Sequence, residues 1–323
     1  MERIKVAVLR GGPSSEYEVS LKTGSAVLRN LPEKYEAVDI LIDKNGLWHL
    51  GGVGKEPHAT FPHFNIAFNA LHGQYGEDGT VQEILDAHGV LYTGSAKFAS
   101  RLAMNKALAK SFLMKAGVKT PLYKVLRKGD LTVPDLVRLF RAFPSPAVVK
   151  PLSAGSSVGV HIVKNFSELE EAMVHAFAIS PEVILEEYIG GREATCGIID
   201  DFRGEKHYAL PPAEIRPPAD ASFFDYEAKY GGRSQEICPG NFTAEEAGEI
   251  KELARVAHKN LGLRHYSRSD FIIHPKRGIY FLEANTLPGL TEESVLPKSV
   301  VAVGSSLGEF LEHVISLAVK NSH

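Results

Sequence analysis

Short apolar runs alternate with amphipathic stretches along the first hundred residues of the chain. Runs rich in Val, Ile and Leu predict buried strands, and apolar positions three and four apart predict helices. The predicted strands lie at 4–9, 37–42, 66–71 and 90–92, and the predicted helices at 19–31 and 81–88. This alternation is typical of an open parallel sheet. Such sheets bind ligands at the carboxyl ends of their strands, where the glycine-rich segments 11–16 and 72–80 occur.

The remaining chain divides into two further regions. A helix is predicted over 99–116, with Ser100 as its N-cap and Gly117 as its stop. Strands and one helix follow up to residue 190, and the last region adds helices over 244–260 and 307–320. A length of 323 residues is more than one hydrophobic core usually serves. The expected organisation is therefore a set of three domains, over 1–100, 101–190 and 191–323.

Two apolar runs near the C-terminus flank a turn at 274–278 that contains Pro and Gly. Both runs are rich in β-branched and aromatic residues, so an antiparallel hairpin is expected. Because side chains alternate between the faces of a strand, Arg268 shares a face with Asp270, and Glu283 shares one with Asn285. Pairing about this turn places Asp270 opposite Glu283 or the residue before it.

Asp270, Glu283 and Asn285 together offer two carboxylates and an amide oxygen. Oxygen ligands suit a hard cation such as Mg²⁺, which binds through few carboxylates and keeps positions for substrate phosphates. The alternative is an ordinary solvated strand face that carries surface charges.

Two further segments could bind a nucleotide. Lys150 precedes a loop of small residues, 155–159, whose backbone N–H groups can approach a phosphate while the lysine supplies a charge. The alternative is a surface hairpin that needs glycines to turn. The strand predicted over 184–189 could offer its backbone to an adenine edge, and Glu193 could accept from ribose hydroxyls. An edge strand kept soluble by its charges is the alternative there.

Composition excludes several classes of protein. Hydrophobic residues make up 44% and charged residues 23% of the chain, as in ordinary soluble globular proteins. A formal net charge of -3 argues against a general nucleic-acid binder. No membrane span or signal peptide is expected, because long uncharged apolar runs are absent from the sequence. Cys196 and Cys238 lack the spacing of a zinc site or a disulfide scaffold, so a reduced, cytoplasmic enzyme is expected.

The order of these segments resembles the ATP-grasp ligases, and specifically the D-alanine–D-alanine ligase family. The resemblance runs from Val6 to about Pro297. The matching motifs are Gly11-Gly12-x-Ser14-x-Glu16-x-Glu18-Val19-Ser20-Leu21, Leu71-His72-Gly73-x-x-Gly76-Glu77-Asp78-Gly79-Thr80, Lys150-Pro151-x-x-x-Gly155-Ser156-Ser157-x-Gly159, Asp225-Tyr226-Glu227-Ala228-Lys229-Tyr230, Arg268-x-Asp270-Phe271 and Glu283-x-Asn285-Thr286-x-Pro288-Gly289-x-Thr291-x-x-Ser294.

The resemblance implies an α/β (α+β) protein with the three-domain ATP-grasp fold and an N-terminal, Rossmann-like open parallel sheet. It also implies an ATP-dependent ligase that joins two D-alanines through a D-alanyl phosphate, for peptidoglycan precursor synthesis. Another ATP-grasp carboxylate–amine ligase, or one that joins D-alanine to a different acceptor, is the alternative. A non-catalytic nucleotide-binding protein is less consistent with Arg268, because binding alone does not need a cation for the transition state.

The resemblance also implies roles for individual residues. Asp270, Glu283 and Asn285 would hold two Mg²⁺ ions, with Mn²⁺ and a monovalent cation as further candidates. The residues implied for ATP are Lys106, Lys150, Ser157, Glu186, Glu187, Ile189, Glu193 and Lys229. The residues implied for the two amino acids and the reacting atoms are Glu16, His72, Ser156, Lys229, Tyr230, Arg268, Gly289 and Ser294.

Within the last set, Glu16 would bind the ammonium of the first D-alanine, with His72 near it. Ser294 and Lys229 would hold the carboxylate of the second. Arg268 and the Gly289 N–H would stabilise the transferring phosphoryl group and the developing oxyanion. Hydrogen bonds from Ser156 and Tyr230 to Glu16 would close a loop at about 222–236 over the site.

Four positions depart from the usual family residues. Tyr17 replaces an Arg, Glu187 a Lys beside the adenine, Ser269 a Val, and Val295 a Leu next to the second amino-acid site. None of them removes a proposed ligand or phosphate cation, so affinity is expected to change rather than the reaction. The family implies a homodimer, with no nucleic-acid or membrane partner.

Overall fold

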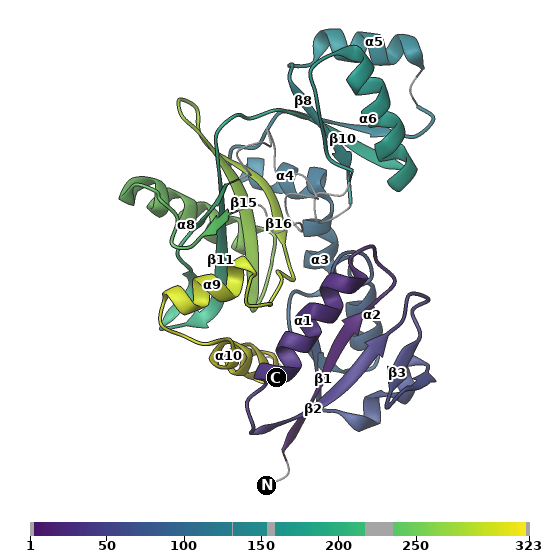
Figure 1. Cartoon of the computed structure of the whole chain (residues 1–323), viewed down its shortest axis with the longest axis vertical. Coiled ribbons are helices and arrows are strands. Elements are labelled where there is room, and N and C mark those ends of the chain that lie inside the picture. Colours follow the sequence, from purple (N-terminus) through teal and green to yellow (C-terminus); the bar gives the residue numbers. More distant parts are fainter. Residues whose placement is uncertain (1–2, 131, 154–158, 217–234, 321–323) are drawn as a thin grey trace.

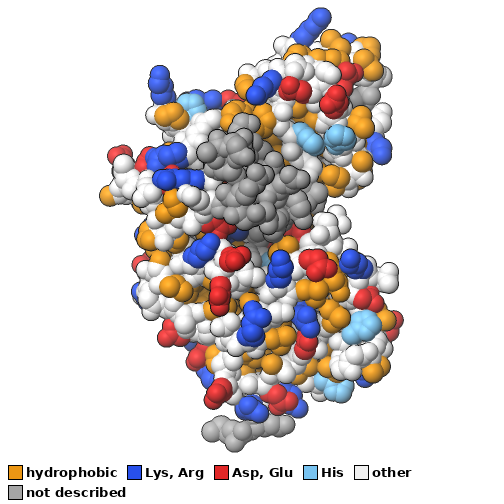
Figure 2. Space-filling view, viewed as in Figure 1, with side chains coloured by type: hydrophobic (Ala, Val, Ile, Leu, Met, Phe, Trp, Pro, Cys, Tyr) orange, Lys and Arg blue, Asp and Glu red, His pale blue; other side chains and the backbone are white. Residues whose placement is uncertain are grey.

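The computed structural model describes residues 3–130, 132–153, 159–216 and 235–320 (Figure 1). Its strands form three sheets that follow one another along the chain. On the face drawn in Figure 2, Lys and Arg side chains are interspersed with Asp and Glu over the described residues. Short hydrophobic patches lie between them.

The first sheet is mostly parallel, as the hydrophobic pattern predicted. Its strands lie in the order β4-β3-β2-β1-β5-β6, and β2, β1, β5 and β6 run parallel. The antiparallel edge pair β3–β4 was not predicted. The strands are β1 (Ile4–Gly11), β2 (Tyr35–Ile42), β3 (Trp48–Leu50), β4 (Val53–Lys55), β5 (Ile66–Asn69) and β6 (Leu91–Tyr92). The helical segments are α1 (Tyr17–Asn30), η1 (Pro57–Ala59), η2 (Phe61–His63) and α2 (Thr80–Asp86).

The single helix predicted over 99–116 is wrong, because the structure breaks it in two. α3 (Lys97–Met104) and α4 (Lys106–Lys115) are separated by Asn105, whose backbone is extended with φ -83° and ψ 99°. The Asn105 side chain accepts a hydrogen bond from the backbone N–H of Leu108 and caps α4. Ser100 lies inside α3 and does not cap a helix; its hydroxyl donates to the Ser95 carbonyl.

The second sheet is antiparallel, in the order β7-β10-β8-β9. Its strands are β7 (Tyr123–Arg127), β8 (Ala147–Pro151), β9 (His161–Val163) and β10 (Glu182–Glu187). Two helices, α5 (Val133–Ala142) and α6 (Phe166–Ile179), accompany it, so the prediction of one helix in this region is wrong (Figure 1). A capping box between Thr132 and Asp135 begins α5. The apolar sides of both helices pack with Val149 and Leu185 in one core.

The third sheet carries the predicted hairpin. Its strands lie in the order β14-β13-β11-β15-β16, and β12 also pairs with β11. They are β11 (Arg192–Phe202), β12 (Glu205–Ala209), β13 (Ala213–Arg216), β14 (Gln235–Ile237), β15 (Tyr266–His274) and β16 (Gly278–Asn285). The helices are α8 (Ala244–Asn260), α9 (Val295–Ala302) and α10 (Leu307–Lys320). α8 and α10 have the bounds that the sequence predicted.

The end of the described chain packs against its beginning. Phe310 and Leu311 of α10 share a core with Val6 of β1 and Phe68 of β5 (Figure 1). The first and third sheets are therefore joined by apolar packing, and polar side chains of both can meet in one cavity. Among the described residues, no single helix is long and apolar enough to cross a membrane; α9 and α10 pass only as a pair bent by 101°.

Candidate active site

The β15–β16 hairpin has the register that the sequence predicted. Asp270 pairs with Glu283, and Arg268 pairs with Asn285. A bulge after Asp270 shifts the register toward the turn, where the pairs are apolar. The four polar side chains therefore share one face at the open end of the hairpin.

Both oxygens of Asp270 are engaged by the protein. Arg268 donates from Nε to Oδ1 at 2.9 Å and from Nη2 to Oδ2 at 3.0 Å. Thr195 on β11, directly opposite Asp270, donates its hydroxyl to Oδ1 at 2.6 Å. Such a bidentate pair holds the carboxylate and the guanidinium in fixed geometry. The sequence indicated the arginine but gave no signal for Thr195, which comes from a distant strand.

The second carboxylate of the patch also faces a cation. Lys106 Nζ lies 3.2 Å from Glu283 Oε2, and the lysine side chain is only 8% exposed. Lys106 is the first residue of α4, so the helix break at Asn105 decides where its side chain begins. The resemblance implied that Lys106 contacts a phosphate. In the structure its side chain points to the carboxylate patch and not to bulk solvent.

The residues of this patch fit Mg²⁺. They offer carboxylate oxygens from Asp270 and Glu283 and an amide oxygen from Asn285, which are ligands that a hard cation prefers. Arg268 pairs with Asp270 and Lys106 pairs with Glu283 in the structure. A divalent ion would supply the same compensating positive charge. Asn285 Oδ1 accepts from the Leu287 N–H at 3.1 Å, and this contact holds the amide at the end of β16.

A buried group of three charges lies beside the second sheet. Glu186 on β10 is 2% exposed and lies 2.9 Å from Lys150 Nζ and 3.3 Å from Lys110 Nζ. Burial opposes ionisation of Glu186, but the two ammonium groups outweigh it and lower its pKa. Burial lowers the pKa of Lys110 to about 8, against the attraction of Glu186. The Lys110 ammonium also donates to the Leu282 carbonyl at 2.7 Å.

Lys110 is a charged residue near the candidate phosphate site that the motifs did not identify. Its spacing of four from Lys106 puts both lysines on one face of a helix, so a signal was present in the sequence. The two predicted lysines and Lys110 are brought together from α4 and β8 around Glu186 and Glu283.

The other predicted adenosine residues lie where β10 leads into β11. Glu187 accepts from Arg277 at 2.7 Å, and this contact lowers its pKa. Ile189 is buried, and Glu193 on β11 pairs with Ile215 and Ile272. The unusual glutamate at 187 is therefore accommodated by an arginine from the β15–β16 turn.

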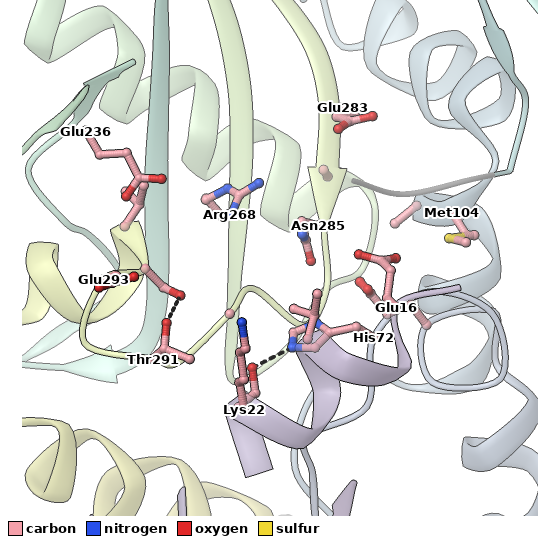
Figure 3. A pocket seen from close by; sticks show the side chains of 18 of the residues that line it. Glu16, Lys22, His72, Met104, Glu236, Arg268, Glu283, Asn285, Thr291 and Glu293 are labelled. Carbon is pink, nitrogen blue, oxygen red and sulfur yellow. Dashed lines mark hydrogen bonds between the residues drawn. The ribbon is translucent and has the colours of Figure 1, made fainter. Parts of the chain in front are cut away.

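A cavity of about 250 Å³ lies between the first and third sheets (Figure 3). Glu16 and His72 line it from the N-terminal region, across from Arg268 and Asn285. The full set of predicted residues that line it is Glu16, His72, Lys106, Arg268, Glu283, Asn285, Gly289 and Ser294. Lys22, Glu77, Glu236 and Glu293 also line it, although no role was predicted for them.

His72 is held as a buried imidazole. Its Nε2 lies 2.7 Å from the Thr23 hydroxyl in a hydrogen bond, and the Ser14 hydroxyl donates to its backbone carbonyl at 2.6 Å. Burial lowers the pKa of His72, outweighing the nearby Glu16 carboxylate. Gly73 follows with φ +69°, and a Cβ there would lie 2.6 Å from Glu16 Oε2. Glycine therefore lets this loop approach Glu16 closely.

Glu77 ties the N-terminal loop to the end of β16. Its Oε1 accepts from the Gly73 N–H at 3.0 Å, and its Oε2 accepts from the backbone N–H groups of Thr286 and Leu287 at 3.2 and 3.1 Å. Burial raises the pKa of Glu77 to about 7, and the Glu16 carboxylate adds to this effect. The sequence placed Glu77 in a motif without a role, because its partners are more than two hundred residues away.

The third side of the cavity is a tight turn before α9. Ser294 Oγ lies 2.8 Å from Thr291 Oγ1, and the Ser294 N–H donates to the Thr291 carbonyl at 2.9 Å. A Cβ on Gly289 would lie 2.8 Å from Ser294 Oγ. Gly289 and Ser294 therefore lie close together, and both line the cavity.

Four predicted site residues lie outside the described part of the chain. They are Ser156, Ser157, Lys229 and Tyr230. Most of the loop predicted to close at about 222–236 lies outside it as well.

The other departures from the family pattern lie beside the site. Tyr17 stacks under Lys44, whose Nζ is 5.1 Å from the ring centre. Ser269 is buried opposite Cys196, and its hydroxyl has no hydrogen-bond partner among the described groups. Val295 packs in a small core near the cavity. None of the three takes a predicted ligand out of the site.

Three sheets with buried lysines, an arginine and paired carboxylates between them define an ATP-grasp ligase. Solved structures agree with this class. VanG D-Ala:D-Ser ligase from Enterococcus faecalis matches with a TM-score of 0.85 and 29% identity, covering 98% of this chain and 100% of that one. D-alanine–D-alanine ligase from Bacillus anthracis complexed with ATP matches with a TM-score of 0.80 and 33% identity, covering 99% and 98%.

Sequence comparison narrows the class. Residues 112–316 match the model of the D-ala D-ala ligase C-terminus, and residues 5–63 and 51–95 match that of the N-terminus. A D-alanine–D-alanine ligase of Geotalea uraniireducens is 40% identical over 97% of this chain and 95% of its own length. One of Geobacter sulfurreducens is 40% identical over 92% and 88%. The chain belongs to the D-alanine–D-alanine ligase family, and both the resemblance and the fold class expected from the motifs are confirmed.

Proposed function

We propose that this protein joins two molecules of D-alanine into D-alanyl-D-alanine, with conversion of ATP to ADP and phosphate, for peptidoglycan precursor synthesis. The observation that carries the proposal is the meeting of Glu16 and His72 with Arg268 and Asn285 around one cavity of about 250 Å³. An amino-acid carboxylate can react with a nucleotide only where both sites share a space. The cavity provides that space between the first and third sheets.

In the first step, a carboxylate oxygen of the first D-alanine attacks the γ-phosphorus of ATP. The bond to the β-phosphate oxygen breaks, ADP leaves, and D-alanyl phosphate forms. This transfer depends on positioning and charge neutralisation. Arg268 is the residue proposed to stabilise the moving phosphoryl group, since its guanidinium lines the cavity and is held at β15 by Asp270.

In the second step, the neutral amine of the second D-alanine attacks the carbonyl carbon of the acyl phosphate and loses a proton as the amide bond forms. Negative charge develops on the carbonyl oxygen before phosphate leaves with its bonding electrons. The N–H of Gly289 and the Arg268 guanidinium are proposed to stabilise that oxygen. Ser294 is proposed to bind the carboxylate of the second D-alanine, together with Lys229. A Cβ added to Gly289 would lie 2.8 Å from Ser294 Oγ, so the two residues are close enough to share one pocket.

The first D-alanine is proposed to place its ammonium on Glu16. His72 has a lowered pKa and stays neutral beside it, so it does not repel the ammonium. We assign Glu77 a positioning role, because it fixes the His72–Gly73 loop against Thr286 and Leu287. Closure of the loop at about 222–236 by Ser156, Tyr230 and Glu16 would exclude water, which hydrolyses acyl phosphates.

Lys106 and Lys150 are proposed to exchange their carboxylate partners for ATP phosphates. Lys106 faces Glu283 and Lys150 faces Glu186 in the structure, so both cations are already positioned and desolvated. Two Mg²⁺ ions, or Mn²⁺, held by Asp270, Glu283 and Asn285 would neutralise phosphate charge when bound. Ser157 and Lys229 are further phosphate contacts in the proposal, and Glu186, Glu187, Ile189 and Glu193 are its adenosine contacts.

Four further predictions belong to this proposal, two from the family resemblance and two from cysteine usage and chain organisation. They are a homodimer, a cytoplasmic location, activation by a monovalent cation, and the three domains at 1–100, 101–190 and 191–323.

An assay of purified protein with ATP, Mg²⁺ and D-alanine tests the function. Phosphate release and a D-alanyl-D-alanine product are expected, with neither formed from L-alanine or in excess EDTA. Adding D-serine or D-lactate to D-alanine tests the acceptor site, because a D-Ala:D-Ser ligase has a similar structure. Phosphate release that requires D-lactate or D-serine, with none from D-alanine alone, would contradict the proposed acceptor and identify a D-alanine–D-X ligase.

A further inference from the structure

A cluster of two histidines and an aspartate lies at the end of β11 that is remote from the cavity. Asp200 on β11 pairs with His207 on β12, and His258 reaches both from the last turn of α8. Thr195, which contacts Asp270 of the active site, lies five residues earlier on β11, about 16 Å away along a strand. The cluster is therefore separate from the proposed phosphate site.

The side chains of the cluster converge on one carboxylate oxygen. Asp200 Oδ1 lies 2.7 Å from His207 Nδ1 and 3.0 Å from His258 Nε2. All three ligand atoms lie within 4.8 Å of one another. In a tetrahedral zinc site, bonds of about 2.0–2.1 Å separate ligand atoms by roughly 3.3 Å. Shifts of a few tenths of an ångström in these side chains would reach that spacing.

Neighbouring groups hold two of the three side chains in orientation. The other oxygen of Asp200 accepts from the His265 N–H at 2.6 Å, which leaves Oδ1 to face the histidines. The Nδ1 atom of His258 lies 2.7 Å from the Ser267 hydroxyl in a hydrogen bond. Metal-ligating histidines commonly use their second ring nitrogen in this way, which fixes the ring and its tautomer.

One atom of the cluster has an unmet requirement. His258 is fully buried, and its Nε2 has no hydrogen-bond partner among the described groups. It lies 3.0 Å from Asp200 Oδ1 as an ion-pair contact, so the tautomer of His258 decides whether a proton or a lone pair faces the carboxylate. With a proton on Nδ1 toward Ser267, the Nε2 lone pair lies next to a carboxylate oxygen. Two acceptors this close, one of them buried, are stabilised by a cation between them.

We propose that Asp200, His207 and His258 form a binding site for one divalent transition-metal ion of the Zn²⁺ type. Two imidazoles and a carboxylate are a common donor set for this ion, with water at the fourth position. His207 and Asp200 are partly exposed, at 22% and 16% of the side chain, so the ion can enter from solvent. Arg255 is the nearby cation: it donates to the His207 carbonyl and pairs with Glu205, which offsets its charge.

The bound ion would crosslink two strands of the third sheet and a neighbouring helix at this end. It would link β11, β12 and the C-terminal turn of α8. His313 of α10 hydrogen-bonds the Asp200 carbonyl at 2.7 Å, and the Gly94 N–H donates to His265 Nδ1 at 3.0 Å. Metal binding is therefore expected to stabilise the junction with the N-terminal region as well.

Titration of the whole protein with Co²⁺ tests the site. Tetrahedral, four-coordinate Co²⁺ gives an intense visible d–d band, whereas octahedral, six-coordinate Co²⁺ gives a weak one. Excess Mg²⁺ in the buffer keeps Co²⁺ from the acidic patch near Arg268. We expect one equivalent to produce the band and excess Zn²⁺ to abolish it. Zn²⁺ should also raise the melting temperature, since it binds the folded state.

Variants locate the binding. His207→Gln removes a partly exposed ligand and is expected to weaken Co²⁺ binding more than about 100-fold, which exceeds the loss that changes around metal ligands cause. Asp200→Asn should do the same. His49→Gln is the matched control, because His49 also lies 3.0 Å from a carboxylate, that of Asp43, but belongs to no metal-binding group among the described residues. Equal binding by wild type and folded His207→Gln, or the absence of the band in wild type, would overturn the proposal. Loss of the band in His49→Gln would overturn it too.

Discussion

The two walls of the cavity differ in whether their titratable side chains are neutral or charged. On the N-terminal wall, burial favours neutral forms: it lowers the pKa of His72 and raises that of Glu77 to about 7. On the opposite wall, charges are kept and paired. Arg268 faces Asp270 at 2.9 Å, and Lys106 faces Glu283 at 3.2 Å.

The difference corresponds to what each wall is proposed to bind. A small amino acid brings one ammonium and one carboxylate, so a wall with few free charges avoids uncompensated repulsion. A triphosphate brings several negative charges and metal ions, so preformed ion pairs can exchange partners without exposing a bare buried charge. Four substitutions test this comparison, from the largest expected effect to the smallest.

Arg268→Lys should have the largest effect. A lysine keeps the charge but loses the planar fork that holds Asp270 and reaches the reacting atoms. Turnover is expected to fall about 1,000-fold, as when a preorganised transition-state donor is lost. Phosphate release at varied D-alanine and ATP gives kcat and KM separately. Arg127→Lys, in an exposed pair with Glu182, is the control. A loss below about tenfold would remove Arg268 from the transition state.

Glu283→Gln should lower turnover about 100-fold at fixed Mg²⁺ and raise the Mg²⁺ concentration needed for half-maximal rate. The carboxylate is both a proposed metal ligand and the partner of Lys106, so the charged wall loses two functions at once. A Mg²⁺ titration of the rate separates metal affinity from the maximal rate. Unchanged turnover and unchanged Mg²⁺ dependence would contradict the metal site.

Glu77→Gln tests the neutral wall through stability. The pKa of Glu77 is about 7 in the folded protein against an ordinary 4.5, so the folded state holds an extra proton between these values. The stabilisation from the raised pKa of Glu77 is fully present below pH 4.5 and is lost as the pH rises through 7. The loss is on the order of 3 kcal/mol. Urea unfolding at pH 5, 6, 7 and 8 should show that the free energy of unfolding depends less on pH in the variant than in the wild type. Equal pH dependence in both proteins would show that Glu77 is not the titrating group.

Glu187→Lys should have the smallest effect. It restores the usual family residue and breaks the partly exposed pair with Arg277. Such pairs contribute about 0.2–1 kcal/mol. We expect a change of that size in the free energy of unfolding and less than about a threefold change in KM for ATP. A larger rise in KM would show that Glu187 contacts the nucleotide directly.

The hairpin was the part of the site that local reasoning could predict. Its strands are adjacent in sequence, so alternation and turn position were enough to pair Asp270 with Glu283. The parallel direction of β2, β1 and β5 followed from the same kind of pattern, although their order in the sheet did not. Glycine at 73 was also visible in the sequence, although its close approach to Glu16 was not.

The errors and omissions arise where contacts are distant. The break at Asn105 was missed because the apolar spacing continues across it, while the capping contact to the Leu108 N–H competes locally with the helix. Glu77 received no role because its partners Thr286 and Leu287 come from the other end of the chain. Lys110 could have been found by its spacing from Lys106, but not its pairing with Glu186.

The sequence by itself determined the parallel strands of the first sheet, the β15–β16 hairpin, several helices and the chemical identity of the candidate ligands, because these depend on residue type and short-range periodicity. Only the tertiary structure decided which charges are neutralised and by which partner. Protonation and ion pairing depend on burial and on distances between segments that the chain brings together by folding. The neutral wall at Glu77, the paired wall at Arg268 and the histidine cluster at Asp200 are all results of that packing.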